Sequence, residues 1–569
     1  TGDAFVDHPS FGTAVIARTL WDRGFSVGVI AQPDWTRDDD FTRLGEPRLF
    51  FGVSSGNVDS MVANYTAAGK RRKEDAYSPG GVPRRPDRAV IVYANRLRSR
   101  FPGVPLVLGG LEASLRRFAH YDYWEDRVRQ SILADAPADI LVYGMGERQV
   151  VAIAERLDTG SPIAAITDIP GTVVKMDLKS WRAADHTGTV VLPSFSEVEK
   201  DPRRYAEAFA LHHREQNPCL GKNVVQPHPK TVIIQNPPAL PLTTEELDHI
   251  YELPYSREAH PSYRVPVPAL ETVQFSITSH RGCFGECSFC ALAHHQGRIV
   301  QSRSEASILR EARSIAASAH FSGTIQDVGG PTANMYGAVC DRWTRGGACA
   351  DRSCSPACPS LHLGHGRAAA LLGTIRAVPN VRHVFVASGI RHDLIPEDDG
   401  GYLDAICRHH VSGHLKVAPE HCTPHVLRLM NKPGIHLFNA FRKRFSDASN
   451  NAGKEQYLLP YLMSGHPGCT VVDMIALAEY LRDTGLYTEQ VQDFTPTPMS
   501  RSTCMYHTGL DPLTMEPVHV PKGREKRIQR AFLRYRDPRN AGLVYEGLAD
   551  AGRTDLIGNG WKCLVRKRR

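Results

Sequence analysis

The chain has 569 residues, of which 42% are hydrophobic and 23% are charged, and its formal net charge is +7. This composition excludes a largely disordered chain, and the length predicts about two to four domains. No apolar run approaches the roughly eighteen residues of a membrane-spanning helix, and the segment after Thr1 lacks a signal-peptide pattern. With 13 cysteines and no such signal, we expect a cytoplasmic protein without a membrane partner, whose clustered cysteines bind metal.

The first section, residues 1–157, alternates short apolar runs with amphipathic ones. A helix is expected at 12–23, and strands are expected at 26–31, 49–54, 89–93, 104–108 and 140–143. Such alternation predicts an α/β domain with a doubly wound parallel sheet. Ligands of these sheets bind beyond the carboxyl ends of the strands, where the loops 7–12 and 109–114 are expected.

The loop 7–12 lies before the first helix, and this arrangement resembles a cobalamin-binding domain. Domains that ligate cobalt through histidine use Asp-x-His-xx-Gly, whereas Asp7 and His8 are adjacent here. We therefore favour a His8 that caps or orients the turn, and we keep cobalamin as the weaker alternative.

Two irregular segments follow. Residues 70–88 are rich in proline, glycine and arginine and predict a long basic loop, which either grips phosphate near the active site or is a solvated excursion. Residues 158–268, which are rich in proline after residue 237, are expected to be a connecting region.

Residues 269–500 again alternate strands with helices. Strands are expected at 272–278, 323–328, 382–388, 412–418, 457–463 and 489–494, with helices such as 304–319 between them. These β/α units predict a partial (β/α)6 barrel, open where a TIM barrel closes, with its active site at the carboxyl ends of the strands. An extension, 501–569, follows and is basic at 522–527 and 566–569.

Cys283, Cys287 and Cys290 form a Cys-xxx-Cys-xx-Cys triplet directly after the first of these strands. Three thiolates on one loop can hold three irons of a 4Fe-4S cluster and leave the fourth iron open. The spacing, with Phe289 before the last cysteine, resembles the radical S-adenosylmethionine (SAM) superfamily, in which SAM binds the open iron and is cleaved to a 5′-deoxyadenosyl radical. The alternative is a structural zinc knuckle, but no matching second pair of ligands follows at a suitable distance.

Two glycines end the second strand of this section. Gly329 and Gly330 stand where radical SAM enzymes commonly carry Gly-Gly-Glu, although Pro331 replaces the glutamate. Glycine allows the main chain to approach a ligand closely, so we expect backbone carbonyls here to receive the methionine amino group of SAM. The alternative is a plain turn.

Polar and charged residues end the third and fourth strands. Ser388 and Arg391 follow the third, where Arg391 either pairs with the methionine carboxylate or bridges to a nearby carboxylate such as Asp393. Lys416 and Glu420 lie at the fourth and form either a ribose- or carboxylate-binding pair or a structural ion pair.

A second cysteine group lies in an insertion, 340–358, after the second strand. Cys340, Cys349, Cys354 and Cys358 can hold a second 4Fe-4S cluster or a structural zinc, and the spacing does not separate the two. We favour the cluster slightly, because the protein is already supplied with one. Four free thiols are the remaining alternative.

Longer sequence words at 7–12, 31–35, 110–117, 119–124 and 521–530, together with both cysteine groups, resemble the YgiQ family of radical SAM proteins along nearly the whole chain. The resemblance implies a SAM-cleaving iron-sulfur protein with a cobalamin-domain-like N-terminal region and a distinctive C-terminal extension. It implies no substrate, although 494–498 resembles the end of methylthiotransferase-type cores.

We therefore predict a radical SAM enzyme of unknown substrate that takes electrons from a donor such as flavodoxin or ferredoxin. No catalytic side chain is assigned. A nucleic-acid-binding protein with structural metal sites is the alternative; it would use the loop around Arg71 and Arg84 and the basic tail, and its RNA binding would be salt-sensitive. An electron-transfer protein would ligate every iron, which the three-cysteine loop disfavours.

Overall fold

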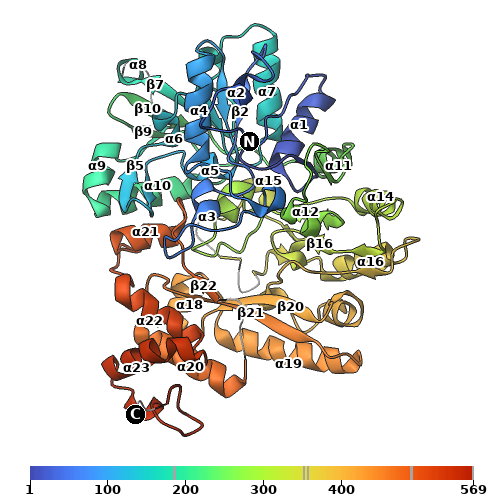
Figure 1. Ribbon diagram of the computed structural model, residues 1–569, viewed down its shortest axis with the longest axis vertical. Helices are drawn as coiled ribbons and strands as arrows, with labels where there is room; N and C mark the ends of the chain where they lie inside the picture. The colour runs from blue at the N-terminus through green and yellow to red at the C-terminus, as the bar shows by residue number, and fades with distance from the viewer. Residues whose placement is uncertain (183–186, 350–352, 355–357, 487–490, 567–569) are drawn as a thin grey trace.

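The structure is a computed structural model that describes the chain except for residues 183–186, 350–352, 355–357, 487–490 and 567–569. The protein is of mixed α/β architecture, and two parts stack along its long axis (Figure 1). The N-terminal part, blue to green, lies above the orange strands, and the red C-terminal helices pack beside them. Among the described residues, no helix combines the length and the apolar character that crossing a membrane needs.

The N-terminal part is built on a seven-stranded sheet. In spatial order its strands are β2 (Phe51–Val53), β3 (Leu106–Leu108), β6 (Ile140–Val142), β7 (Thr172–Asp177), β10 (Thr231–Gln235), β9 (Val224–Pro227) and β8 (Val190–Val191). β2, β3 and β6 are parallel, whereas β7 pairs antiparallel with β6 and β10, and β10 pairs antiparallel with β9. The parallel pairing predicted for residues 1–157 is confirmed for β2, β3 and β6. The strands that residues 158–268 add pair antiparallel, except that β8 is parallel to β9. The short β9–β10 connection permits only antiparallel pairing of those two strands.

The predicted elements of the first section hold in part. The helix α1 (Gly12–Asp22) confirms the one expected at 12–23, and residues 26–31 form no strand. The strand expected at 89–93 is wrong, because this segment begins helix α4 (Ala89–Arg100). Its buried residues recur at helical spacing, so one face packs into the core although the run is β-branched: Ala89, Val90, Tyr93, Ala94 and Leu97.

The segment 158–268, expected to connect the two parts, contains β7 to β10 and therefore extends the first sheet. It also forms helices α10 (Pro202–Arg214), α11 (Thr244–Glu252) and α12 (Pro268–Val273). The domain boundaries at 157, 268 and 500 stay predictions.

In the second part, strands lie in each of the six regions where the sequence predicts one. They are β12 (Ser276–Thr278), β15 with β16 (Thr324–Ile325, Asp327–Gly329), β19 (His383–Val384), β20 (His414–Glu420), β21 (Tyr457–Ser464) and β22 (Val491–Asp493). Successive regions are parallel neighbours, with β19 and β20 joined through a bridge between Ile390 and Val417. The strand expected at 272–278 starts late because α12 occupies its first residues, and residues 489 and 490 of the last lie outside the described chain.

Helices separate these strands and leave the carboxyl strand ends facing the N-terminal part. The main ones are α14 (Glu305–Ala316), α16 (His365–Arg376), α19 (Ile435–Asn451) and α20 (Val471–Thr484). The shorter α13 (Leu292–Gln296) follows the cysteine loop. The C-terminal extension forms α21 (Arg501–Thr508), α22 (Gly523–Leu533) and α23 (Ala541–Asp550).

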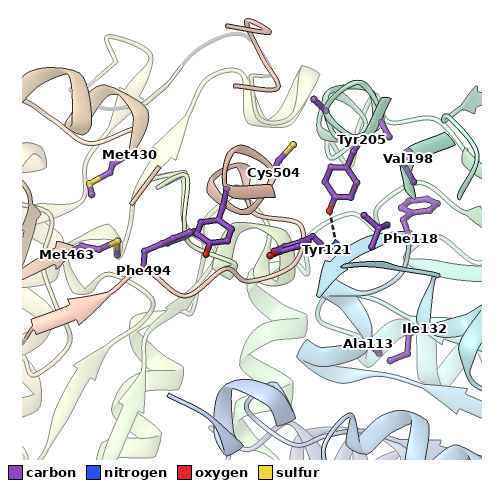
Figure 2. Close-up of a cluster of buried hydrophobic side chains, with 14 of the residues drawn as sticks. Ala113, Phe118, Tyr121, Ile132, Val198, Tyr205, Met430, Met463, Phe494 and Cys504 are labelled. Carbon is purple, nitrogen blue, oxygen red and sulfur yellow. Dashed lines mark hydrogen bonds between the residues drawn. The ribbon is translucent and has the colours of Figure 1, made fainter. Parts of the chain in front are cut away.

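One hydrophobic core joins the N-terminal part to the C-terminal extension. Figure 2 shows Phe118 and Tyr121 of the first part beside Tyr205 of α10, with Cys504 of α21 and Phe494 leading on to Met463 of β21. The backbone N–H of Tyr121 donates to the Tyr205 hydroxyl over 2.9 Å. Buried side chains of both parts therefore pack in one continuous core beside the site between them.

Candidate metal centre and cofactor cavity

The three cysteines of the first triplet lie on the loop between β13 (His280–Arg281) and α13. The loop is closed by backbone bonds, in which the Cys283 N–H donates to the Gly297 carbonyl (3.0 Å) and the Cys290 N–H to that of Cys287 (2.9 Å). Burial, with the neighbouring thiols, raises the pKa of Cys290 to about 12 and raises that of Cys283. Metal binding at this loop would therefore have to displace the thiol protons, as metal sites generally do.

Arg391 fastens the middle of this loop. Its Nη1 donates to the Gly285 carbonyl over 3.3 Å and lies 3.9 Å from the Cys287 sulfur. Its Nε and Nη2 are held by Asp393 at 3.1 and 2.8 Å, which is the alternative pairing considered from the sequence. The structure thus places a buried guanidinium against the cysteine loop, where it can attract thiolate charge.

The donor set of this loop is three thiols. A cubane cluster binds each thiolate on a separate iron, so three cysteines on one loop can hold three irons of such a cluster. A tetrahedral zinc site also accepts thiolates, each at about 2.3 Å from the ion.

A cavity of about 1520 Å³ lies beside the loop, between the two parts of the molecule. Residues on both flanks of the cysteine loop line it, including His280, Arg281 and Leu292. Both N-terminal loops considered from the sequence reach it, through Ser10 and Gly12 and through 109–111. Four predicted cofactor residues also line the cavity, namely Gly329, Gly330, Ser388 and Lys416.

Gly329 and Gly330 are tightly enclosed. The Gly329 carbonyl accepts from the N–H and the hydroxyl of Ser279, at 2.7 and 3.1 Å. A Cβ on Gly330 would lie 2.7 Å from the backbone oxygen of His280, so only glycine fits there. Ser388 packs against Gly329 and donates its hydroxyl to Asp327, whose carboxylate also accepts the Ser388 backbone N–H at 3.0 Å.

The predicted pair of Lys416 and Glu420 is separated. β20 has an irregular register between Val417 and Glu420, and Glu420 adopts a φ of 67°, in the left-handed region. Lys416 lines the cavity, whereas Glu420 is buried 3.8 Å from the Lys432 ammonium. Burial raises the pKa of Glu420, which disfavours its charged form. Glu420 and Arg391 are not among the residues that line the cavity.

His8 orients its own turn, as the sequence analysis favours. Its Nδ1 accepts the backbone N–H of Ser10 over 3.0 Å, and its Nε2 lies 2.9 Å from Arg257. The ring is fully buried and does not line the cavity, although Pro9 and Ser10 do. Burial and the Arg257 charge lower the pKa of His8 to about 3.

The second cysteine group adjoins the first. Cys340, Cys354 and Cys358 pack against the same apolar cluster as Cys283. Burial raises the pKa of Cys354 to about 11, opposed by Arg298 beside the first loop. Cys349 lies 3.8 Å from the guanidinium of Arg342, and residues 350–352 and 355–357 between these cysteines lie outside the described chain.

Several site residues lie too far apart in the sequence for pattern analysis to join them. Glu147, which begins α7 (Glu147–Asp158), forms a buried ion pair with Arg281 over 2.6 Å. Asp327 accepts a hydrogen bond from the hydroxyl of the predicted residue Ser388. Lys432 forms an ion pair with the predicted residue Glu420. The one available signal is position, because Asp327 and Glu147 each stand near the carboxyl end of a strand.

Family models match both ends of the chain, and curated relatives match its whole length. Residues 1–276 match the family model described as Radical SAM N-terminal, and residues 489–569 match a domain of unknown function, DUF3362. A UPF0313 protein of Methanosarcina acetivorans is 55% identical, covering 100% of this chain and 80% of its own length. A UPF0313 protein of Geobacter sulfurreducens is 54% identical, covering 98% and 92%.

Two solved structures are more distant matches. The radical SAM methyltransferase TsrM from Kitasatospora setae, solved with tryptophan and a SAM analogue, is 17% identical with a TM-score of 0.48, over 86% of this chain and 71% of that one. The cobalamin-dependent radical SAM enzyme OxsB is 9% identical with a TM-score of 0.48, over 95% and 68%.

The N-terminal 276 residues match the Radical SAM N-terminal family model, and the three-cysteine loop lies beside a cavity in a chain of mixed α/β architecture. The chain belongs to the UPF0313 family, and the resemblance to the YgiQ family is thereby confirmed.

Proposed function

We propose that Cys283, Cys287 and Cys290 hold a 4Fe-4S cluster and that the cavity beside them binds SAM. When bound, such a cluster supplies one electron, received from a flavodoxin- or ferredoxin-like donor, that cleaves SAM to methionine and a 5′-deoxyadenosyl radical, which takes a hydrogen atom from the substrate. The observation that carries this proposal is that both flanks of the cysteine loop line one large cavity.

The chain's own residues would bind and orient the cofactor. The Gly329 carbonyl is already engaged by Ser279, so the Gly330 carbonyl is the acceptor we assign to the methionine amino group. Lys416 lines the cavity and suits the methionine carboxylate, a role that the Asp393-bound Arg391 no longer offers. The Ser388 hydroxyl donates to Asp327 and keeps lone pairs for a ribose hydroxyl.

Anaerobic reconstitution with iron and sulfide, followed by SAM and dithionite, tests the proposal. Production of 5′-deoxyadenosine by the wild type and by Cys563→Ser, but not by Cys287→Ala, is expected. Cys563 is a free cysteine near the C-terminal end of the sequence that belongs to neither cysteine group, so Cys563→Ser also removes one thiol. Equal production by Cys287→Ala would contradict the assignment.

We propose that the second cysteine group holds either a second 4Fe-4S cluster or zinc, with the cluster slightly favoured. The shared apolar cluster around Cys283, Cys340 and Cys354 supports a centre close to the first. Metal analysis of Cys354→Ala separates the choices: loss of about four irons indicates a cluster, loss of zinc indicates a zinc site, and no loss indicates free thiols.

Cobalamin stays the weaker candidate. The burial of His8 and its bonds to Ser10 and Arg257 leave it unsuited to ligate cobalt in the cavity. Addition of hydroxocobalamin to the reconstituted protein, followed by gel filtration, is expected to leave no bound corrinoid.

Nucleic acid is a second candidate partner, favoured by one contact. The Tyr123 hydroxyl donates to the Ala67 carbonyl over 2.7 Å, and the Lys526 ammonium lies 5.2 Å from the centre of the Tyr123 ring. Tyr123 therefore links the turn that precedes the basic residues 70–73 to the basic helix α22. If RNA binds there, its affinity should fall steeply with salt, and Lys526→Ala should weaken it. Salt-independent or absent binding would exclude this partner.

A further inference from the structure

The C-terminal extension reaches the middle of the cysteine loop through Ser502. Ser502 is the second residue of α21 and lies in the part of the chain that matches DUF3362. Its backbone N–H donates to the Ser288 carbonyl over 2.9 Å, and the hydroxyls of the two serines lie 2.8 Å apart. Ser288 stands between Cys287 and Cys290 in the sequence. Two bonds therefore tie the extension to the segment that carries two of the three thiols.

The direction of the hydroxyl bonds follows from His466, which lies just beyond β21. Its Nδ1 is 2.7 Å from the Pro467 carbonyl, which can only accept, so Nδ1 carries a proton. Burial lowers the pKa of His466 to about 3, so the ring is neutral and its Nε2 accepts. The nearer donor is the Ser502 hydroxyl at 2.7 Å, since the Ser288 hydroxyl is 3.3 Å away. Ser288 therefore donates to Ser502, and Ser502 donates to His466.

The ring of His466 also contacts the aromatic residue before the last cysteine of the loop. It meets the Phe289 ring edge to face, with centroids 6.1 Å apart, and the Phe494 ring with centroids 5.4 Å apart. Phe494, like Ser502, belongs to the part that matches DUF3362. Ser288, His466 and Ser502 are buried, so a polar group among them that loses its partner is left unsatisfied.

The opposite side of the loop is held by the second part of the molecule. The Ser288 N–H donates to the Met430 carbonyl over 3.0 Å, and the Asn431 side-chain amide donates to the Glu286 carbonyl over 2.9 Å. Ser288 is thus held from two directions, by Met430 through its N–H and by Ser502 through its carbonyl and its hydroxyl. The position of the loop therefore depends on the C-terminal extension as well as on the second part.

We propose that Ser502 is a positioning residue of the metal centre, through which the C-terminal extension holds the cysteine loop in the shape that binds the cluster. The inference rests on the proposed function. It assigns a role to the part of the chain that matches DUF3362, which is to complete a metal centre whose three cysteines lie some 200 positions earlier in the sequence. A loop that is already fixed loses less conformational freedom when it binds its ligand.

Iron release from the reconstituted full chain to a chelator, under anaerobic conditions, tests the anchor. Ser502→Ala should release iron about two- to tenfold faster than the wild type, because buried hydrogen bonds of the loop are lost. Ser502→Thr keeps the hydroxyl and should release iron like the wild type. Thr503→Val is the matched control, because it removes a buried hydroxyl of the same helix that donates to the Thr497 carbonyl instead of to the loop.

Equal iron release from Ser502→Ala and Thr503→Val would overturn the inference and leave the proposed function intact. If the wild type binds no iron at all, the proposed function fails, and the inference fails with it. Amide hydrogen exchange of residues 283–290 in the metal-free protein is a second readout. Ser502→Ala should speed this exchange and Thr503→Val should not, because only the first releases the loop. Unchanged exchange in Ser502→Ala would also overturn the inference.

A double-mutant cycle separates the contact from a general loss of stability. Ser288→Ala removes the other hydroxyl of the same contact, so the two changes should not act independently. The double variant Ser288→Ala/Ser502→Ala should therefore release iron about as fast as the faster of the two single variants. If the two effects multiply instead, Ser502 acts on the metal centre by another route, and the inference is overturned.

Discussion

Gly285 lies under Arg391 in the cysteine loop, and Gly285→Ala tests how strongly that contact holds the metal centre. A Cβ at this position would stand 2.5 Å from the Arg391 Nη1 and 3.4 Å from the Cys283 sulfur. Ordinary contact begins at 3.4 Å, so Nη1 has to retreat by about 0.9 Å. It is not free to do so, because Asp393 holds the other two nitrogens of the same guanidinium.

The expected cost is the bond from Nη1 to the Gly285 carbonyl. A hydrogen bond from a charged donor contributes about 1.5–3 kcal/mol, which corresponds to about a tenfold to hundredfold loss in cluster retention. Iron release to a chelator under anaerobic conditions measures that loss. Gly366→Ala is the control, because its Cβ would meet nothing within 4 Å. Iron release from Gly285→Ala as slow as from the control would refute the reasoning.

Three further predictions follow from buried groups. Lys432→Met should lower the free energy of unfolding by about 1–3 kcal/mol, because it leaves the buried Glu420 carboxyl without this polar partner. Urea unfolding measures this loss, and the added change Glu420→Gln should recover part of it. The pKa of His8 is about 3 in the folded protein and about 6.5 in the unfolded chain. As the pH falls below about 6.5, His8 therefore becomes protonated in the unfolded chain but stays neutral in the folded protein. Relative to His8→Asn, the wild type should therefore lose about 1.4 kcal/mol per pH unit between pH 6.5 and 5; parallel stability curves would contradict the burial of a neutral His8. Gly330→Ala should slow 5′-deoxyadenosine formation up to about 100-fold, because the added Cβ clashes with the His280 backbone and shifts the end of the strand. A rate like that of the wild type would show that Gly330 does not contact SAM.

Short sequence patterns predict best the features whose residues lie close together in the sequence. The three cysteines lie on one loop, as their spacing predicts, and the helix at 12–22 follows from its own periodicity. The metal at this loop stays a prediction. The run Val90 to Val92 misled, because β-branched residues also pack on a buried helix face. The predicted number of strands in the first sheet is too low, because β7 to β10 lie in the proline-rich segment that was expected to be a connecting region.

The chemistry of the cavity depends on long-range contacts that no local pattern contains. Glu147 meets Arg281 across 134 positions of the sequence, and Ser114 meets His295 across 181. The sequence leaves open whether Arg391 pairs with Asp393 or with a ligand, and the structure shows the pair with Asp393. Residue type therefore predicted which side chains can bind a cofactor, and only the structure separated those that line the cavity from those that hold the loop.

The open iron is the central claim, and Mössbauer spectroscopy of the ⁵⁷Fe-reconstituted protein tests it most directly. To observe the first centre alone, the spectrum is taken on the Cys354→Ala variant, with and without SAM. Three cysteine ligands predict that about a quarter of the cluster iron changes its signal when SAM binds, since only the fourth iron is free. A cluster whose irons all keep their signals in saturating SAM would contradict the account and indicate a fully ligated, structural centre.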